Sequence, residues 1–156
     1  MTKGNRGAGP RALVVASRYN EAVTRRLIDG AMIALREGGF AEAAVDVVWV
    51  PGAFELPMAV RGGLAGGRYG LAVALGAVIR GETDHYRYVA GEAARGLMDV
   101  ALHFGVPVGF GLLTCDTLEQ ALARAGGASG NKGEEAVRAA LEMRRVLDRL
   151  GAGVAR

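Results

Sequence analysis

The sequence predicts a single α/β domain, a three-layer sandwich in which helices cover both faces of a four-stranded parallel sheet. Four short apolar segments alternate along the chain with stretches of helical periodicity. One of them, GLAVALGAVI at 70–79, is apolar almost throughout, as expected of a strand buried on both faces. Such alternation favours parallel strands joined by right-handed crossovers, with helices on both sides of the sheet.

The other three strands are expected at 12–17, 44–50 and 106–114. The first, ALVVAS, is a short β-rich run, and the second, AVDVVWV, is rich in β-branched residues. In the last, VPVGFGLLT, Pro107 falls near the start, where a strand tolerates a residue without an N–H group.

A helical pattern follows each strand. Asn20 is expected to cap the first helix, which should end at Gly38-Gly39. Its apolar positions, four residues apart, are Val23, Leu27, Ala31 and Leu35. A shorter helix is expected after VPGAFE, with Pro57 in its first turn.

Three further helices complete the pattern. The third should carry an apolar stripe of Val89, Ala93, Leu97, Val100 and Phe104. DTLEQALARAG predicts a fourth, capped by Asp116 or Thr117. The loop GGASGNKG should lead into a last helix whose inward candidates include Val137, Leu141 and Leu150.

The length of 156 residues fits one domain, expected at 12–150 between tails at 1–11 and 151–156. The N-terminus is polar and Gly-rich, which predicts a flexible tail rather than a signal peptide. No apolar run approaches the ~20 residues that cross a bilayer, so no membrane partner is expected. Cys115 is the only cysteine, which excludes an intrachain disulfide and suits a reducing compartment. We therefore expect a cytoplasmic protein.

The formal net charge is +3 and the sequence pI is about 9.4. Basic residues are interleaved with acidic ones, as where Glu134 and Arg138 stand four apart in a predicted helix. No group of aromatic residues accompanies a basic run. These features favour a solvated surface of mixed charge over a nucleic-acid binder, whose retention on DNA would depend on salt.

Polar and aromatic residues gather in the segments that follow the four strands, where parallel sheets bind ligands. These segments are SRYN (17–20), PGAFE (51–55), RGETDHYR (80–87) and CDT (115–117). The coincidence predicts a site at the carboxyl edge of the sheet.

Each candidate also has a purely structural interpretation. Tyr19 could stack on a planar ring or simply pack where a helix begins. Gly52 could let a ligand approach the backbone and Glu55 could accept from its hydroxyls, although PGAFE alone is an ordinary strand-to-helix turn. Backbone N–H groups near Glu82 and Thr83 could hold an anion, although Thr83 or Asp84 could equally cap the helix.

His85 is the best candidate for general acid–base chemistry, because an ordinary histidine titrates close to neutral pH. The other histidine, His103, falls late in a helix and is expected at a surface or interface. Arg124 and Lys132 flank a Gly-rich loop and could meet a phosphate. The sequence has no phosphate loop of the G-x-x-x-x-G-K-[ST] type, no dinucleotide turn after the first strand and no Cys/His metal spacing.

Taken together, VPGAFELP (50–57), GAVIRGETDHYRYV (76–89), FGLLTCDTLEQALARAG (110–126) and GNKGEEA (130–136) resemble the motifs of the 6,7-dimethyl-8-ribityllumazine synthase family, in the family's order. The resemblance covers roughly residues 11 to 150. It implies a flavodoxin-like fold and the penultimate step of riboflavin synthesis. In that step 5-amino-6-ribitylaminouracil condenses with 3,4-dihydroxy-2-butanone 4-phosphate and phosphate is released, without a metal or organic cofactor.

The resemblance also implies a role for each matching residue. His85 matches the proton-transfer residue, Glu82 and Thr83 the phosphate-side turn, and Arg124 the cation of the phosphate. The positions that match the aminouracil site are Tyr19, Ala53, Phe54, Glu55, Ala77, Val78, Ile79 and Phe110. Lys132 matches a position lining the site, and in the family a neighbouring subunit supplies the equivalents of Phe110, Arg124 and Lys132. Tyr19 stands where the family usually has Phe or Trp.

The family forms pentamers, and in many members twelve pentamers close into a hollow shell. The resemblance therefore implies a homopentamer here, with a 60-subunit shell as the larger alternative and riboflavin synthase as a candidate partner. A non-catalytic flavin- or lumazine-binding oligomer is the competing hypothesis. Such a binder would need neither the phosphate side, Thr83 with Arg124, nor His85.

Overall fold

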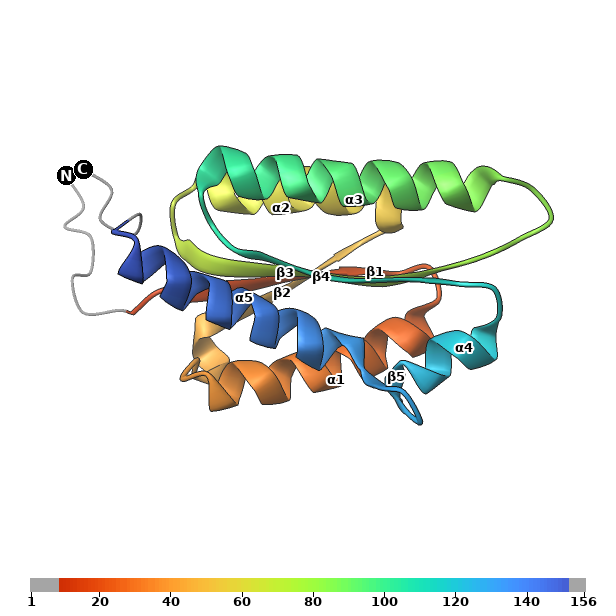
Figure 1. The fold of residues 1–156 in the computed structure, drawn as a ribbon, viewed down its shortest axis with the longest axis horizontal. Helices are drawn as coiled ribbons and strands as arrows, with labels where there is room; N and C mark the ends of the chain where they lie inside the picture. The colour runs from red at the N-terminus through yellow and green to blue at the C-terminus, as the bar shows by residue number, and fades with distance from the viewer. Residues whose placement is uncertain (1–8, 152–156) are drawn as a thin grey trace.

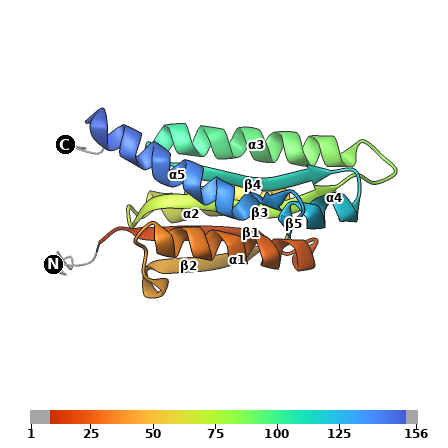
Figure 2. The ribbon, with the colours of Figure 1, turned by 60° about the horizontal axis from the view of Figure 1, so that its bottom comes forward.

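A computed structural model describes residues 9–151 as three layers (Figure 1). The central layer is a parallel sheet in the order β2-β1-β3-β4, formed by β1 (Arg11–Ser17), β2 (Val45–Val50), β3 (Tyr69–Ile79) and β4 (Val108–Cys115). Helices α2 (Leu56–Ala65) and α3 (His85–Phe104) cover one face. On the other face lie α1 (Glu21–Glu37), α4 (Leu118–Ala123) and α5 (Lys132–Arg149) (Figure 2). The predicted sandwich, with its flavodoxin-like strand order, is confirmed.

The strands lie within two residues of their expected bounds. β3 is a central strand, and its residues 71–77 are buried, which explains why that segment is apolar without alternation. β2 is an edge strand, and there Val47 and Val48 remain about two-fifths exposed. Short 3₁₀ helices at Glu42–Ala44 and Ala53–Glu55 precede and follow β2.

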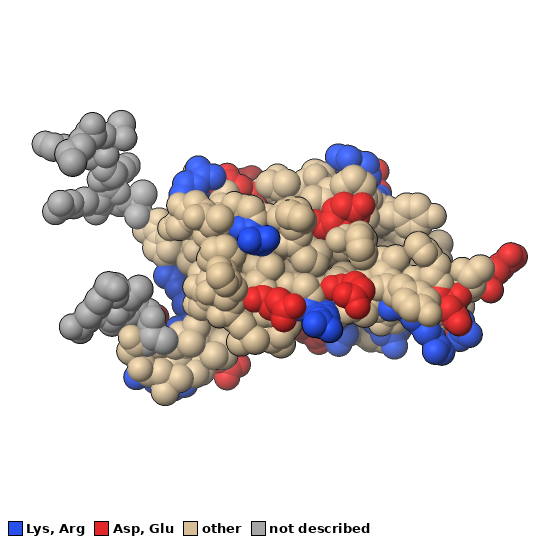
Figure 3. Space-filling view, turned by 90° about the horizontal axis from the view of Figure 1, so that it is seen from above, with Lys and Arg blue, Asp and Glu red and all other residues tan. Residues whose placement is uncertain are grey.

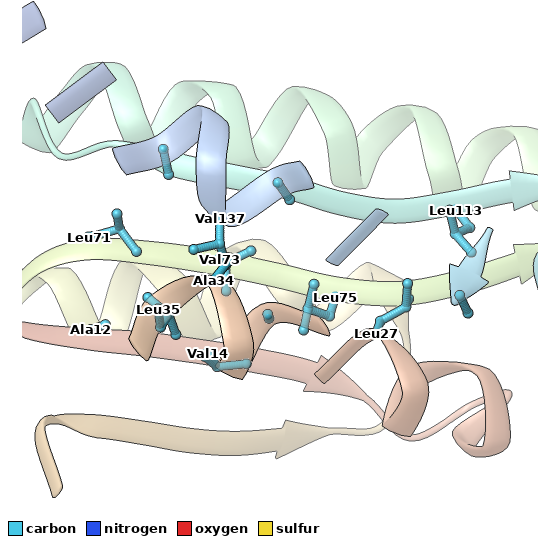
Figure 4. Close-up of a cluster of buried hydrophobic side chains, with 14 of the residues drawn as sticks. Ala12, Val14, Leu27, Ala34, Leu35, Leu71, Val73, Leu75, Leu113 and Val137 are labelled. Atoms are coloured by element: carbon cyan, nitrogen blue, oxygen red, sulfur yellow. The ribbon is translucent and has the colours of Figure 1, made fainter. Parts of the chain in front are cut away.

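Two apolar cores form, one on each side of the sheet. The core beneath α1 and α5 contains Leu27 and Leu35 of α1, Val73 of β3 and Val137 of α5, all fully buried (Figure 4). The core beneath α2 and α3 contains the opposite set of strand side chains, including Val15 of β1, with Leu56 and Leu97 from the helices. Consecutive strand residues point to opposite faces, so β1 and β3 contribute to both cores.

Helices α1 and α5 cross at close range because glycine lies at the contact. A Cβ on Gly133 would collide with the backbone carbonyl of Leu27, and a Cβ on Gly30 would collide with the side chain of Asn131. That side chain also caps α5, since its oxygen accepts from the N–H groups of Gly133 and Glu134 at 2.9 and 3.1 Å. The start of α5 is thereby fixed against α1.

Most helix boundaries follow the predicted signals. Helix α1 ends before Gly38, and Gly39 has a φ of 95°, in the left-handed region that glycine allows. Pro57 lies in the first turn of α2, and Thr117 caps α4 by accepting from the N–H of Gln120 at 3.2 Å. Glu134 and Arg138 form the predicted pair, with 2.7 Å between Oε1 and Nη2.

Two predictions near the C-terminal helix are wrong. Leu150 does not point inward but is 74% exposed, because α5 ends at Arg149 beyond the edge of the core. The segment GGASGNKG is not all loop: it overlaps a small antiparallel hairpin of β5 (Ala125–Gly127) and β6 (Gly130–Asn131), and its last two residues already belong to α5. Gly130 permits the turn with a φ of 79°.

A cluster of charged and phenolic groups joins the amino ends of three strands. Arg11 donates two hydrogen bonds to Asp46, at 3.2 Å from Nε and 2.8 Å from Nη2, and the Tyr69 hydroxyl donates a third at 2.7 Å. The hydrogen bonds from Arg11, and then from Tyr69, hold the pKa of the Asp46 carboxyl below its ordinary value. Burial and the neighbouring Asp46 raise the pKa of the Tyr69 hydroxyl.

β1 begins and α5 ends at the same end of the molecule, opposite the end at which α3 begins (Figure 1). The expected tails lie almost entirely outside the described residues, and Arg11 already belongs to β1. Across residues 9–151, no helix combines the length and the apolar character that crossing a membrane requires.

Candidate functional site

A cavity of about 780 Å³ opens at the carboxyl ends of β1, β2 and β3. The strand order reverses between β1 and β3, and such switch points are where open parallel sheets bind ligands. Three segments line the cavity: the β1–α1 turn, the β2–α2 turn, and the end of β3 with the start of α3. The structure thus brings together three of the four predicted segments. CDT lies outside this lining.

Backbone hydrogen bonds hold the first two segments side by side. The N–H of Arg18 donates to the carbonyl of Val50 at 2.8 Å, and the N–H of Tyr19 donates to the carbonyl of Pro51 at 3.1 Å. The Tyr19 side chain is 76% exposed and lines the cavity, so it is not a packing residue at a helix start. Its ring is available to stack on a planar ligand.

Asn20 does not cap α1 as predicted. Its side chain makes no capping hydrogen bond, and instead Nδ2 donates to the carbonyl of Ala77 on β3 at 2.9 Å. The backbone of Asn20 has a φ of 60°, in the left-handed region. The sequence offered no signal for this contact, because its partner lies far along the chain.

The β2–α2 turn supplies an apolar and an acidic group. Ala53 is buried, whereas Phe54 is 62% exposed and Glu55 is exposed beside it. The N–H of Glu55 donates to the carbonyl of Gly52 at 3.2 Å and closes the turn. A Cβ on Gly52 would lie 3.4 Å from Glu55 Oε2, so the carboxylate lies over the glycine. This arrangement presents an acceptor for ligand hydroxyls.

The end of β3 forms the floor between these turns. β1 pairs with β3 only as far as Leu75, so Ala77, Val78 and Ile79 extend beyond the last β1 pair. On the other side, β4 remains paired through Ile79. One backbone edge of β3 therefore has no strand beside it where it lines the cavity.

At the start of α3, the cavity is lined by Gly81, Thr83 and His85. The N–H of His85 donates to Thr83 Oγ1 at 3.4 Å, while Asp84, the residue before the helix, makes no side-chain cap. A Cβ on Gly81 would meet nothing within 4 Å, so the fold does not itself require glycine there. The open space in front of this turn suits an anion at a helix N-terminus.

Four predicted site residues do not line this cavity. Glu82 stands in the turn between the lining residues Gly81 and Thr83 but is not itself part of the lining, and Arg124 lies at the end of α4, where Nη1 donates to the carbonyl of Gln120 at 3.0 Å. Phe110 and Lys132 line a second cavity of about 630 Å³, between α3 and α5 beside β4. Lys132 Nζ lies 2.6 Å from Glu135 Oε2. Within one chain, the structure does not bring Phe110, Arg124 or Lys132 to the cavity that contains His85.

Several further residues line the cavity although the sequence analysis gave them no role in the site, among them Tyr86, Tyr88 and Glu92. Tyr88 and Glu92 follow His85 by three and seven residues, so helical spacing was a usable signal for them. The guanidinium of Arg80 lies over the ring of Tyr86, 5.6 Å from the ring centroid. Nη1 of the same arginine lies 3.9 Å from Asp116 Oδ1. Through these two contacts, Arg80 connects the start of α3 to the CDT segment.

The described residues do not favour a reactive cysteine or a metal site. Burial raises the pKa of the Cys115 thiol, which disfavours a reactive thiolate. In residues 9–151, no group of three or more His, Cys, Asp or Glu side chains is arranged to hold a metal ion. His103 is exposed at the far end of α3, as predicted.

The family model for 6,7-dimethyl-8-ribityllumazine synthase matches residues 9–148. The chain is 60% identical over 144 residues to a protein of Gemmatimonas aurantiaca with that name, covering 92% of this chain and 88% of the relative. A protein of the same name from Anaeromyxobacter dehalogenans is 49% identical over 150 residues, or 96% of this chain and 93% of the relative.

A third such protein, from Edwardsiella ictaluri, is 51% identical over 138 residues and 88% of each chain. The family match spans every strand of the sheet and all three segments that line the cavity. The chain therefore belongs to the 6,7-dimethyl-8-ribityllumazine synthase family.

Proposed function

We propose that this protein is a 6,7-dimethyl-8-ribityllumazine synthase of riboflavin biosynthesis. It condenses 5-amino-6-(D-ribitylamino)uracil with 3,4-dihydroxy-2-butanone 4-phosphate and releases phosphate. The observation that carries the proposal is the cavity at the β1/β3 switch point. It combines an exposed aromatic ring, a carboxylate, an open backbone edge and a histidine at a helix start.

The aminouracil requires a flat surface and polar groups at fixed positions. The exposed ring of Tyr19 provides the surface, and the unpaired backbone edge of Ala77–Ile79 provides donors and acceptors for the pyrimidine. Glu55 accepts from the ribityl hydroxyls, with Ala53 and Phe54 forming the wall beside them. A neutral heteroaromatic ring is bound by stacking and hydrogen bonds rather than by charge.

The phosphorylated ketone requires positive potential. The turn Glu82–Thr83 at the start of α3 offers backbone N–H groups and the positive end of a 20-residue helix. In the proposed assembly, Arg124 of a neighbouring copy adds a guanidinium, which binds phosphate more strongly than a neutral donor does. Both groups also stabilise the charge that grows on the phosphate as it leaves.

The reaction needs protons moved near one carbon centre. The amine adds to the ketone and water is lost to form an imine. Phosphate is then eliminated, and ring closure with loss of a second water gives the lumazine. His85 moves these protons, and an imidazole suits the task at neutral pH. The steps involve no net oxidation or reduction, so they call for no external oxidant, reductant or redox cofactor. Holding two substrates together can contribute about 7–11 kcal/mol.

The active form that we propose is a homopentamer in which neighbouring copies complete each site. It is supported by the position of Phe110, Arg124 and Lys132, which lie away from the cavity of their own chain. It is also supported by the α2–α3 face, where wide uncharged areas separate scattered charges (Figure 3). Exposed apolar residues at this face and at the second cavity include Met58, Met98, Leu102 and Phe110.

We extend the proposal to a cytoplasmic location, to riboflavin synthase as the partner that consumes the product, and to a 60-subunit shell as the larger assembly. The mixed charges of Figure 3 do not favour a nucleic-acid partner. Light scattering of the purified protein distinguishes a pentamer from a shell.

The decisive experiment mixes the two substrates with the protein and follows the absorbance and fluorescence of the lumazine. Release of inorganic phosphate at the same rate should accompany it. Formation of lumazine no faster than in a protein-free control would contradict the proposal. If the protein bound the lumazine tightly without such turnover, the non-catalytic binding hypothesis would replace it.

A further inference from the structure

We propose that Asn20 is a positioning residue for the pyrimidine substrate. Its side-chain amide continues the hydrogen bonding of β3 beyond the end of β1 by occupying the Ala77 carbonyl. The backbone N–H and C=O of Ile79 are then the pair on this edge that remains free to bind the substrate. The inference rests on the proposed function and adds a residue to it. Asn20 lines the cavity but acts through β3.

The backbone of Asn20 is the first observation. Among the described residues, it is the only one other than glycine with a positive φ, at 60°. Asparagine tolerates the left-handed region better than most residues, yet such conformations concentrate at functional sites. Asn20 lies three residues after the end of β1 at Ser17, and its carbonyl begins α1 by accepting from the N–H of Thr24 at 3.1 Å.

The second observation is the position of the Asn20 amide on the sheet. The last β1–β3 pair is Ala16 with Leu75. Two residues further along β3, the carbonyl of Ala77 accepts from Asn20 Nδ2 at 2.9 Å, where a longer β1 would have placed a backbone N–H. The side chain thus satisfies a carbonyl that would otherwise point into the cavity.

The direction of the Ile79 backbone follows from the β3–β4 pairing. The N–H of Arg80 donates to the carbonyl of Cys115 at 2.8 Å, so the backbone groups of Arg80 and Val78 face β4. Successive strand residues direct their N–H and carbonyl groups to alternate sides. Ile79 therefore faces the same side as Ala77, toward the cavity, with no strand beside it.

The backbone of Ile79 therefore offers one free donor and one free acceptor, two residues beyond the Ala77 carbonyl that Asn20 already occupies. A planar ring carrying an adjacent N–H and C=O, as a pyrimidinedione does, matches this single open pair. With Ala77 unoccupied, a second acceptor would lie beside the pair and the ring could bind in a shifted register. Asn20 removes that alternative, and the N–H of the neighbouring Tyr19 donates to the carbonyl of Pro51.

Two substitutions separate the amide from the backbone conformation. Asn20→Gly keeps the left-handed conformation at no steric cost and removes the donor. Asn20→Asp keeps the shape and places an acceptor against the Ala77 carbonyl. We expect both to raise the KM for the aminouracil, and its Kd by calorimetry, at least tenfold. The KM for the ketone phosphate should change less than twofold.

The control is Arg25→Ala, an exposed position on α1 outside the cavity, which should leave both KM values unchanged. Aminouracil constants within twofold of the wild type in a folded Asn20→Gly protein would overturn the inference, as would equal losses for both substrates. If Asn20→Asp does not fold, Asn20→Gly decides alone. A wild-type protein without turnover would refute the proposed function, while the calorimetric comparison would still test Asn20.

Discussion

The backbone N–H of His85 donates to the hydroxyl of Thr83 at 3.4 Å, which connects the proposed proton-transfer residue to the proposed phosphate turn. Both side chains line the same cavity, at the first turn of α3. Phosphate bound in front of this turn would lie close to the imidazole. Elimination of phosphate and transfer of the proton can then take place within one small region.

Replacing His85 with alanine should lower kcat by roughly 10²–10⁴-fold, the usual contribution of a positioned acid–base group. Its side chain is exposed, so the melting temperature and the assembly should not change. Stopped-flow formation of lumazine measures the first effect, and light scattering the second. His103→Ala is the matched control, at the opposite end of the same helix. Full activity of His85→Ala would remove the proton-transfer role.

Replacing Arg124 with alanine should mainly raise the KM for the ketone phosphate. A hydrogen bond to a charged group contributes about 1.5–3 kcal/mol, so its loss should raise this KM by roughly ten- to hundredfold. The KM for the aminouracil should change little. Arg61→Ala, on the exposed side of α2, serves as the control in the same assay. An unchanged KM for the phosphorylated substrate would exclude Arg124 from the phosphate site.

Replacing Gly133 with alanine should destabilise the protein by about 1–3 kcal/mol, because the added methyl group meets the backbone carbonyl of Leu27. Gly62→Ala provides the comparison: it lies in α2, where a Cβ meets nothing within 4 Å. Alanine there should stabilise by about 0.5–1 kcal/mol. Chemical denaturation of the two variants should shift the midpoint in opposite directions. An unchanged denaturation midpoint for Gly133→Ala would show that α1 and α5 can move apart at little cost in stability.

Replacing Asp46 with asparagine should remove a stabilisation that depends on pH. The hydrogen bond from Arg11 lowers the folded-state pKa of this carboxyl, so its contribution is complete above the ordinary carboxyl pKa of about 3.9. It is lost as the pH falls through the lower, folded-state value. The difference in melting temperature between wild type and variant should therefore be constant from pH 7 to 5 and narrow in more acidic buffer. A gap independent of pH would contradict this account.

The sequence alone predicted the sheet, because burial on both faces leaves a continuous apolar run such as 70–79. It also predicted the three turns that line the cavity, since the carboxyl ends of parallel strands meet at one edge, but it wrongly added CDT, which lies outside the lining. Helix ends were predictable where the cap is local, as at Thr117. These features depend on neighbours in sequence or on the general geometry of parallel sheets.

What the sequence could not predict depends on contacts between distant segments. Asn20 is a natural helix cap by type, but its amide bonds to Ala77, 57 residues away. Leu150 fits the apolar spacing of α5, but no element of the described chain covers it. Phe110 and Lys132 line another cavity, and their spacing along the sequence does not indicate this; only the family resemblance implied that they lie outside the site of their own chain.

The shared location of the start of β1 and the end of α5, opposite the cavity, has a practical consequence for protein engineering. A linker between these two points would close the chain without crossing the cavity, and new termini could then be opened in an exposed turn such as Gly66–Gly67. A fusion attached near the original ends would leave the mouth of the cavity clear. The end of the molecule that is suited to fusion or linkage is therefore opposite the end that carries the candidate site.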